Sequence, residues 1–219
     1  MSYSVKEIFY TLQGEGAQTG RASIFCRFTG CNLWSGLEKD RNKSACPFCD
    51  TDFVGTNGEG GGKFSHSKQL AHAIVQCWHQ AVPQAPDHKS TGAKPYVVFT
   101  GGEPLLQLTA ELIDDLHQAG FEVGVETNGT LVAPDGIDWL CVSPKQLDNL
   151  QQRSGNELKL LFPLSQLPPE AFVDLSFERF YLQAVDEAGD DNLPAVIHYC
   201  LTHPQWRVSL QTHKLLGLK

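Results

Sequence analysis

The sequence lacks any long apolar segment. No run in its 219 residues approaches the roughly 18 consecutive apolar residues that a membrane-spanning helix needs. Its N-terminus, MSYSVKEIFYTLQGEG, has no basic stretch followed by an apolar one, so no secretory signal is expected. We therefore expect a cytoplasmic protein with no membrane partner, folded as one domain over residues 1–219.

Positive charge is also scarce. Lys and Arg number 17 against 25 Asp and Glu, which gives a formal net charge of −8. Proteins that bind nucleic acids need clustered cations to neutralise phosphates. Here the cations are scattered, apart from Lys39, Arg41 and Lys43 in one polar stretch. The composition therefore weighs against a nucleic-acid partner and favours a small-molecule substrate.

The seven cysteines do not suit a disulfide framework, because seven is odd and a reducing compartment is expected. Four lie among apolar residues, a context typical of buried structural thiols: Cys26, Cys77, Cys141 and Cys200. The other three lie in a loop punctuated by Gly, Asn and Pro: Cys31, Cys46 and Cys49. This contrast separates the last three as candidate ligands.

Short apolar runs alternate with stretches of helical periodicity. Strands are predicted over residues 22–28, 96–100, 122–126, 139–142, 158–162, 179–184 and 207–211. Helices are predicted over 67–80, 108–119 and 190–203, and surface loops over 55–64 and 83–94. Continuously apolar strands are typical of a parallel sheet covered by helices, so the pattern predicts an α/β fold. About seven strands with fewer helices predict a partial, open barrel of the TIM type rather than a closed one.

Polar motifs follow four consecutive predicted strands. They occupy residues 29–31, 100–104, 126–129 and 143–145. In parallel α/β folds the functional residues gather where strands end and loops begin. We therefore expect these motifs to line one active-site mouth.

The cysteine spacing, Cys31-x14-Cys46-x2-Cys49, offers three soft thiolate ligands. Such ligands suit an iron–sulfur cluster, zinc or copper(I). A redox CxxC pair beside a stray cysteine and a Cys₃His zinc site using His66 or another histidine are equally compatible with the spacing. Three cysteines without a fourth would leave one iron of a [4Fe-4S] cluster open to a small ligand. Spacing alone does not decide between these readings.

The three cysteines, Phe48 just before the last of them, and the Thr-Gly-Gly-Glu-Pro motif of residues 100–104 together resemble the radical S-adenosylmethionine (SAM) superfamily. Most members have a CxxxCxxC motif, so the first spacer of this chain is longer. Loop-closure entropy grows slowly with length, and the longer spacer costs only on the order of 1 kcal/mol. In that superfamily the GGEP element meets the amino group of SAM, because glycines let the backbone approach a ligand closely.

A narrower resemblance runs nearly end to end. The motifs IFYTLQGEG (residues 8–16), FCRFTGCNL (25–33), CDT (49–51), VETNG (125–129), SPK (143–145) and QTHK (211–214) resemble 7-carboxy-7-deazaguanine synthases. The resemblance implies a carbon–nitrogen lyase that converts 6-carboxy-5,6,7,8-tetrahydropterin to 7-carboxy-7-deazaguanine with loss of ammonia, on the route to queuosine. It implies a [4Fe-4S] cluster, catalytic SAM whose 5′-deoxyadenosyl radical takes a hydrogen from substrate C6, and Mg²⁺ that assists the ring contraction.

The resemblance also implies site residues. Those that would bind substrate are Leu12, Gln13, Gly14, Arg27 and Thr100. Those that would bind SAM are Phe48, Cys49, Asp50, Gly102, Ser143, Pro144, Lys145 and Gln183. The metal ligands would be Cys31, Cys46 and Cys49 for the cluster and Thr51 for Mg²⁺. No side chain is assigned as catalytic, and Gln211, His213 and Lys214 are candidates to close the substrate pocket.

One interpretation of Arg27 does not depend on the resemblance. Arg27 is an isolated cation within an apolar strand, so it needs an anion if it faces the interior. A substrate carboxylate can supply that anion through a bidentate fork. The alternative is an arginine that faces water.

The resemblance further implies a homodimer and an electron donor such as flavodoxin or ferredoxin. Two other classes stay open at this stage. One is a radical SAM activase that installs a glycyl radical on a partner enzyme, and the other is a zinc-binding domain without enzymatic activity.

Overall fold

The computed structural model describes residues 2–82, 94–185 and 191–219. Its strands form a nine-stranded sheet in the order β3-β1-β2-β4-β5-β6-β7-β8-β9. The pairs β2–β4, β4–β5, β6–β7, β7–β8 and β8–β9 are parallel, whereas β1 and β3 are antiparallel. Within the described residues the sheet has two end strands and is open, which confirms the α/β fold with an open, mostly parallel sheet. No helix in this part of the chain is both long and apolar enough to cross a bilayer.

The chain divides into two compact units that interleave along the sequence. The first unit comprises Met1–Thr11, Ala22–Val125 and Ala133–Asp138, and the second comprises Leu12–Arg21, Glu126–Val132 and Trp139–Lys219. The prediction of one domain over residues 1–219 stays a prediction.

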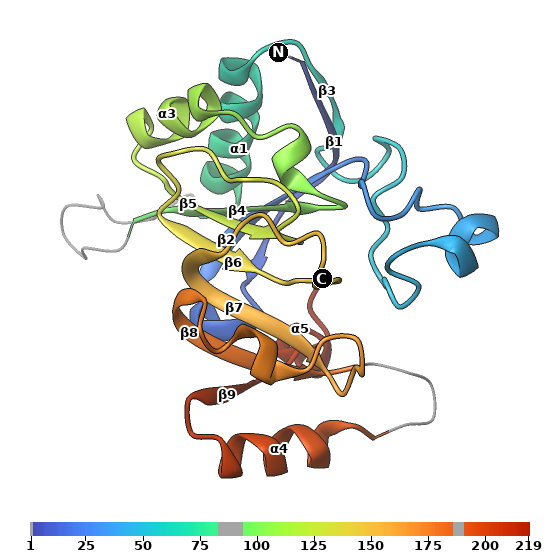
Figure 1. The fold of residues 1–219 in the computed structure, drawn as a ribbon. Coiled ribbons are helices and arrows are strands. Elements are labelled where there is room, and N and C mark those ends of the chain that lie inside the picture. Colours follow the sequence, from blue (N-terminus) through green and yellow to red (C-terminus); the bar gives the residue numbers. More distant parts are fainter. Residues whose placement is uncertain (1, 83–93, 186–190) are drawn as a thin grey trace. The chain divides into compact units, whose positions relative to one another are not determined.

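The first unit holds the N-terminal strands and two helices. The elements are β1 (Tyr3–Leu12, whose last residue belongs to the second unit), β2 (Ala22–Phe28), η2 (Glu38–Lys43), β3 (Gly62–Phe64), α1 (Ser67–Ala81), β4 (Tyr96–Gly101), η3 (Pro104–Leu106), α3 (Ala110–Gln118) and β5 (Glu122–Thr127, whose last two residues belong to the second unit). Helices α1 and α3 lie side by side (Figure 1). Their buried residues, among them Leu70, Ile74, Leu112 and Leu116, recur at helical spacing and form part of the core of this unit.

The second unit holds the C-terminal strands. Its elements are η1 (Gly16–Gln18), β6 (Trp139–Val142), β7 (Ser154–Phe162), η4 (Pro169–Phe172), β8 (Ser176–Ala184), α4 (Leu193–Thr202), β9 (Trp206–Ser209) and α5 (Thr212–Leu216). Helix α4 lies beside β8 and β9 (Figure 1). In the parallel strands β6 to β8, the apolar side chains of Val142, Leu158, Leu160 and Leu182 are fully buried.

The predicted elements are largely confirmed. Strands β2 and β6 have the predicted bounds, and the other predicted strands and helices differ from the observed ones by a few residues at their ends. Residue 190 of the third predicted helix, and residues 83–93 of the second predicted loop, lie outside the described residues.

Among the strands and α-helices of the described residues, three were not predicted. The loop prediction for residues 55–64 is wrong at its end, because Gly62–Phe64 pairs with β1 as β3. Strand β1 itself was missed because Lys6 and Glu7 interrupt its apolar run, yet both are buried, with Lys6 paired to Asp52 and Glu7 to Arg27. The short helix α5 was also missed.

Helix α3 begins and ends at residues that suit those positions. Thr109 precedes its first turn, and the Thr109 hydroxyl accepts a hydrogen bond from the Leu112 N–H at 3.3 Å. The same hydroxyl pairs with the Tyr3 hydroxyl of β1 at 2.7 Å. Gly120 follows the helix with φ +85°, a left-handed conformation that favours glycine. One hydroxyl therefore both caps α3 and ties it to β1.

We expect Thr109→Ala to lower the free energy of unfolding by about 1–2 kcal/mol, because the cap and the bond to Tyr3 are lost together. Thr109→Ser keeps the hydroxyl and is the matched control, with most of the stability retained. Urea denaturation measures both. Equal losses in the two variants would contradict the role given to the hydroxyl.

Candidate active site

The first two polar motifs meet where β2 and β4 end. In the parallel register Phe28 lies opposite Gly101, so the two strands end level with one another. A Cβ on Gly101, which has φ +147°, would lie 2.4 Å from the Phe28 carbonyl oxygen. A Cβ on Gly102 would lie 2.2 Å from the carbonyl oxygen of Gly30 and 2.8 Å from the Cβ of Cys31. Both glycines are therefore required by close packing of backbone on backbone.

Hydrogen bonds hold the motif of residues 100–104 in this position. The Glu103 N–H donates to the Gly30 carbonyl at 2.9 Å, and the fully buried Glu103 carboxylate accepts from the Leu105 N–H at 2.9 Å. The Gln107 side chain donates to the Thr29 carbonyl at 2.8 Å and accepts from the Ser4 N–H at 2.7 Å. The loop that carries Cys31 is thus tied directly to the glycine-rich motif.

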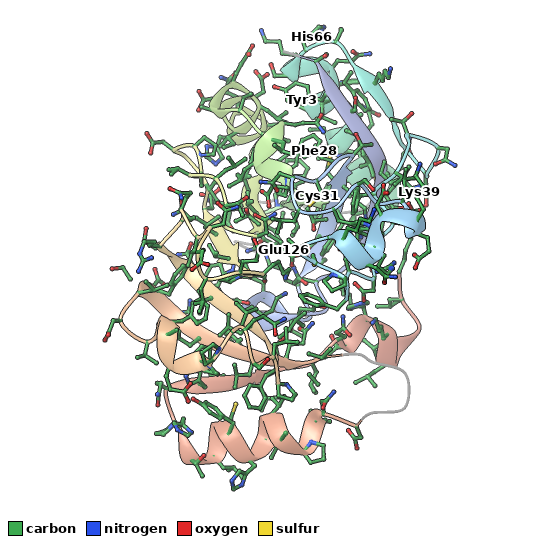
Figure 2. All side chains as sticks on the ribbon, turned by 45° about the vertical axis from the view of Figure 1, so that its right-hand side comes forward. Tyr3, Phe28, Cys31, Lys39, His66 and Glu126 are labelled. Atoms are coloured by element: carbon green, nitrogen blue, oxygen red, sulfur yellow. The ribbon has the colours of Figure 1, made fainter. Side chains whose placement is uncertain are left out.

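The three candidate cluster ligands belong to the first unit, and within the described residues none of them forms a disulfide. Cys31 follows β2, and its sulfur accepts from the Leu33 N–H at 3.4 Å. Cys46 and Cys49 belong to one turn, in which the Cys49 N–H donates to the Cys46 carbonyl at 3.3 Å. Burial raises the pKa of the Cys31 thiol, and the charge of Glu103 adds to this, whereas the Leu33 and Trp34 N–H groups act in the opposite direction. In Figure 2, Cys31 lies among the side chains of the first unit and Lys39 lies on η2.

The donor set fits an iron–sulfur cluster, because thiolates are the ligands that such clusters take. Among the described residues, no three His, Cys, Asp or Glu side chains form a group that could hold one metal ion. In a four-iron cluster each thiolate binds a different iron, so the three sulfurs need not share one ion-sized point. His66 caps α1 instead, because its Nδ1 accepts from the Gln69 N–H at 3.2 Å.

Two predicted substrate residues lie on adjacent strands. Arg27 of β2 and Thr100 of β4 are register partners, so their side chains project from the same face of the sheet. The Nε of Arg27 lies 2.9 Å from Oε1 of Glu7, and both side chains are largely buried. Glu7 is therefore an internal anion that the sequence pattern did not reveal. Within the described residues, the terminal nitrogens of Arg27 make no hydrogen bond or ion pair.

The turn that carries Cys46 and Cys49 is followed closely by Thr51, the predicted magnesium ligand. Thr51 is half-buried and precedes Asp52, which forms an ion pair with Lys6 at 2.8 Å. Asp52 also accepts from the Val54 N–H at 3.1 Å, which fixes the chain just beyond Thr51. Phe48 is half-buried and Asp50 is exposed on the same turn.

In the second unit, Gln13 and Gly14 form the turn after β1, where Leu12 is half-buried. The backbone of Gln13 pairs with Arg21 and Gly20, and its side-chain amide donates to Oε1 of Glu126 at 3.0 Å. A Cβ on Gly14 would lie 2.1 Å from Nδ1 of His213, so only glycine fits beneath that ring. The C-terminal motif therefore packs on Gly14, and the closure of a substrate pocket by His213 stays a prediction.

A buried ion pair lies beside this turn. The Nζ of Lys159 donates to the Glu15 carboxylate, which also accepts from the side-chain amides of Gln183 at 3.2 Å and Gln211 at 2.9 Å. Burial alone would raise the pKa of Glu15, but Lys159 and the Gln211 amide lower it to about 2. Glu15 likewise raises the pKa of Lys159 well above its ordinary value, against the effect of burial. Both groups are therefore charged at neutral pH.

The ion pair is part of a longer polar chain. The Ser209 hydroxyl donates to Oε1 of Gln183 at 2.9 Å and accepts from the Gly16 N–H at 3.0 Å. Glu157 accepts from the Ala17 N–H at 2.9 Å, and burial raises the pKa of Glu157. The family resemblance implied a SAM-binding role for Gln183. It gave no role to Glu15 or Lys159, because a Glu and a Lys far apart in sequence carry no local signal.

The last predicted SAM motif also belongs to the second unit. The Ser143 N–H donates to the Thr127 carbonyl at 2.8 Å, so residues 143–145 leave the sheet beside the motif at 126–129. Pro144 is buried, and Ser143 and Lys145 are half-buried. These two motifs are therefore adjacent, and the single mouth expected for all four motifs stays a prediction.

Comparison with known proteins identifies the family. A 7-carboxy-7-deazaguanine synthase of Bordetella pertussis is 57% identical over 219 residues, which cover all of both chains. The chain belongs to the 7-carboxy-7-deazaguanine synthase family. Synthases of Bradyrhizobium diazoefficiens and Caulobacter vibrioides are 56% and 57% identical, again over the full length of both chains.

A solved structure extends the likeness to the fold. QueE from Escherichia coli is 27% identical with a TM-score of 0.68, and the match covers 96% of this chain and 94% of that one. No protein-family model matches the chain. As a member of the 7-carboxy-7-deazaguanine synthase family, the protein is an enzyme of the lyase type, which confirms the family and the enzyme class expected from the motifs.

The Glu15–Lys159 pair makes stability depend on pH in the acid range. The folded pKa of Glu15, about 2, lies below its ordinary value of 4.5, so its contribution is present above pH 4.5 and is lost as the pH falls towards 2. We expect Glu15→Gln to have a lower free energy of unfolding at neutral pH, because Lys159 stays buried without its partner. Its free energy of unfolding should also fall less than that of wild type on acidification.

Urea denaturation across this pH range measures the effect. The exposed Asp148→Asn is the control for removal of one acidic charge and should retain the wild-type pH dependence. If the free energy of unfolding depends on pH in the same way for wild type and Glu15→Gln, the contribution given to Glu15 is wrong.

Proposed function

We propose that the chain is a radical SAM lyase that converts 6-carboxy-5,6,7,8-tetrahydropterin to 7-carboxy-7-deazaguanine with loss of ammonia, in queuosine biosynthesis. The observation that carries the proposal is the backbone contact of Gly102 with Gly30 and Cys31. It puts the motif that would receive SAM against the first cysteine that would hold the cluster. The full-length similarity to enzymes named for this product supports the choice of reaction.

Cys31, Cys46 and Cys49 would hold a [4Fe-4S] cluster through three of its irons. When bound, the cluster and SAM supply a 5′-deoxyadenosyl radical that removes the hydrogen at substrate C6. The chain itself would position SAM. A backbone carbonyl group at Gly102 would accept a hydrogen bond from the SAM ammonium group. Phe48, Cys49 and Asp50 would border SAM from the turn that carries Cys46 and Cys49. In the second unit, Ser143, Pro144, Lys145 and Gln183 would complete this set.

Arg27 would bind the substrate carboxylate with its terminal nitrogens, while Glu7 holds its Nε. Thr100, on the same face of the sheet, would donate or accept a second hydrogen bond. Leu12, Gln13 and Gly14 would border the pterin ring. Thr51 would give Mg²⁺ one hydroxyl ligand, the remainder coming from substrate oxygens and water.

The function implies partners. A flavodoxin or ferredoxin would supply the electron that reductive cleavage of SAM needs. A homodimer is supported by apolar side chains that the second unit exposes on α4 and α5, such as Leu201 at 79% and Leu215 at 76% exposure. The cytoplasm supplies the reducing conditions that the free thiols require.

Anaerobic turnover tests the function. Reconstituted protein is incubated with carboxytetrahydropterin, SAM, Mg²⁺ and a reductant, and we expect 7-carboxy-7-deazaguanine and ammonia in equal amounts, with SAM recovered. Cys46→Ala should lose both the cluster and turnover, whereas Cys200→Ala, a thiol outside the cluster loop, should retain both. A colourless protein that carries zinc and no iron would overturn the proposal.

Removal of the Arg27 guanidinium should weaken substrate binding. We expect Arg27→Gln to raise KM by roughly 10- to 100-fold, the range for loss of a hydrogen bond to a charged group. Iron content should stay at the wild-type level, because Arg27 contacts Glu7 and not the cysteines. Arg207→Gln, an exposed charge change on β9, is the control. Unchanged kcat/KM in Arg27→Gln would show that the carboxylate binds elsewhere.

A further inference from the structure

The long spacer between the first two cysteines, residues 32–45, is folded. Trp34 is 7% exposed and packs edge-to-face on Phe53, with ring centroids 5.6 Å apart. Gly36 has φ +78°, and a Cβ there would lie 2.4 Å from the Val54 side chain. The spacer therefore shares a small apolar core with the segment that follows the last cysteine.

Arg41, on the η2 turn of this spacer, joins it to the turn that carries the other two cysteines. Its Nη1 donates to the carbonyl oxygen of Pro47 at 2.8 Å and to that of Cys49 at 2.9 Å. Its Nε donates to Glu38 at 2.8 Å, and the guanidinium lies 4.3 Å from the ring centroid of Trp34. Four contacts thus fix one side chain between the spacer core and the cysteine turn.

The charge of Arg41 also lies close to the thiols. Its Nη1 donates to the carbonyl oxygen of Cys49 itself and to that of Pro47, the residue after Cys46, so the guanidinium lies on the turn that carries both thiols. Lys39 and Lys43 carry the same charge on the same η2 turn, but they are exposed and make no hydrogen bond or ion pair within the described residues. This contrast singles out Arg41 among the three cations of the stretch.

We propose that Arg41 is a positioning residue for the iron–sulfur cluster. It holds the Cys46–Cys49 turn through two carbonyl oxygens, and it places one positive charge beside two of the thiolates. The inference rests on the proposed function, because it requires that these cysteines bind a cluster. The role follows from general chemistry: hydrogen bonds to the residues that carry metal ligands orient those ligands, and net charge and nearby dipoles set the potential of iron–sulfur clusters.

Two consequences follow for a variant without this cation. Loss of two hydrogen bonds from a charged donor leaves the turn less ordered, so we expect cluster iron to be lost to a chelator about tenfold faster in Arg41→Gln. Loss of a positive charge disfavours the reduced cluster, which is the more negative form, so the midpoint potential should become more negative. Arg41→Lys should keep most of the potential, because the charge stays, but should lose iron faster than wild type, because an ammonium lacks the fork.

The experiment compares wild type, Arg41→Gln, Arg41→Lys and Lys43→Gln after anaerobic reconstitution. Lys43→Gln removes the same charge from the same turn and should match wild type. Iron and sulfide content, the rate of iron release to bathophenanthroline and an EPR-monitored redox titration are measured. If Arg41→Gln does not fold, Arg41→Lys carries the test through its faster release at a nearly unchanged potential.

The outcomes separate the inference from the function on which it rests. Wild type without a four-iron cluster would overturn the proposed function. Wild type with a cluster, but arginine variants that release iron at the Lys43→Gln rate with the same potential, would overturn the role of Arg41 alone.

Discussion

Close packing of two backbones at the ends of β2 and β4 is the constraint on which the first unit depends. The Gly30 carbonyl accepts from Glu103 and lies where a side chain on Gly102 would have to stand. No other amino acid fits there without displacing the loop that begins at Cys31. A cysteine loop and a glycine-rich loop that are far apart in sequence therefore behave as one rigid piece. A rigid surface of this kind holds two reacting ligands at a constant distance from each other.

Both units place charge in the interior and neutralise it there. Glu7 faces Arg27 in the first unit, and Glu15 faces Lys159 in the second. Buried ion pairs contribute little net stability, because desolvation offsets their attraction. Their value lies in orientation: a guanidinium whose Nε is already held can present its remaining nitrogens in one direction only. Interior pairs of this kind suit an enzyme whose proposed substrate carries a carboxylate and a polar ring.

The fold could be predicted from sequence where a local pattern exists. Runs such as residues 22–28 and 139–142 are apolar without interruption and became strands with the predicted bounds. Strand β1 could not be read in this way, because Lys6 and Glu7 resemble surface residues until their partners are known. The same distinction holds for the residues of the candidate site. Motif residues could be named in advance, whereas the roles of Glu7, Glu15 and Arg41 depend on tertiary contacts that no local pattern records.

The attachment of Gly14 to the C-terminal motif has a consequence for biosynthesis of the chain. The Gly14 carbonyl accepts from the N–H and the hydroxyl of Thr212, 198 residues later, each at 2.9 Å. During translation the turn at residues 13–16 leaves the ribosome early, whereas Ser209, Gln211 and Thr212 are among its last partners to emerge. The polar interior of the second unit thus stays open to water until residues 209–212 have left the ribosome. The nascent chain cannot complete this hydrogen-bonded network before then.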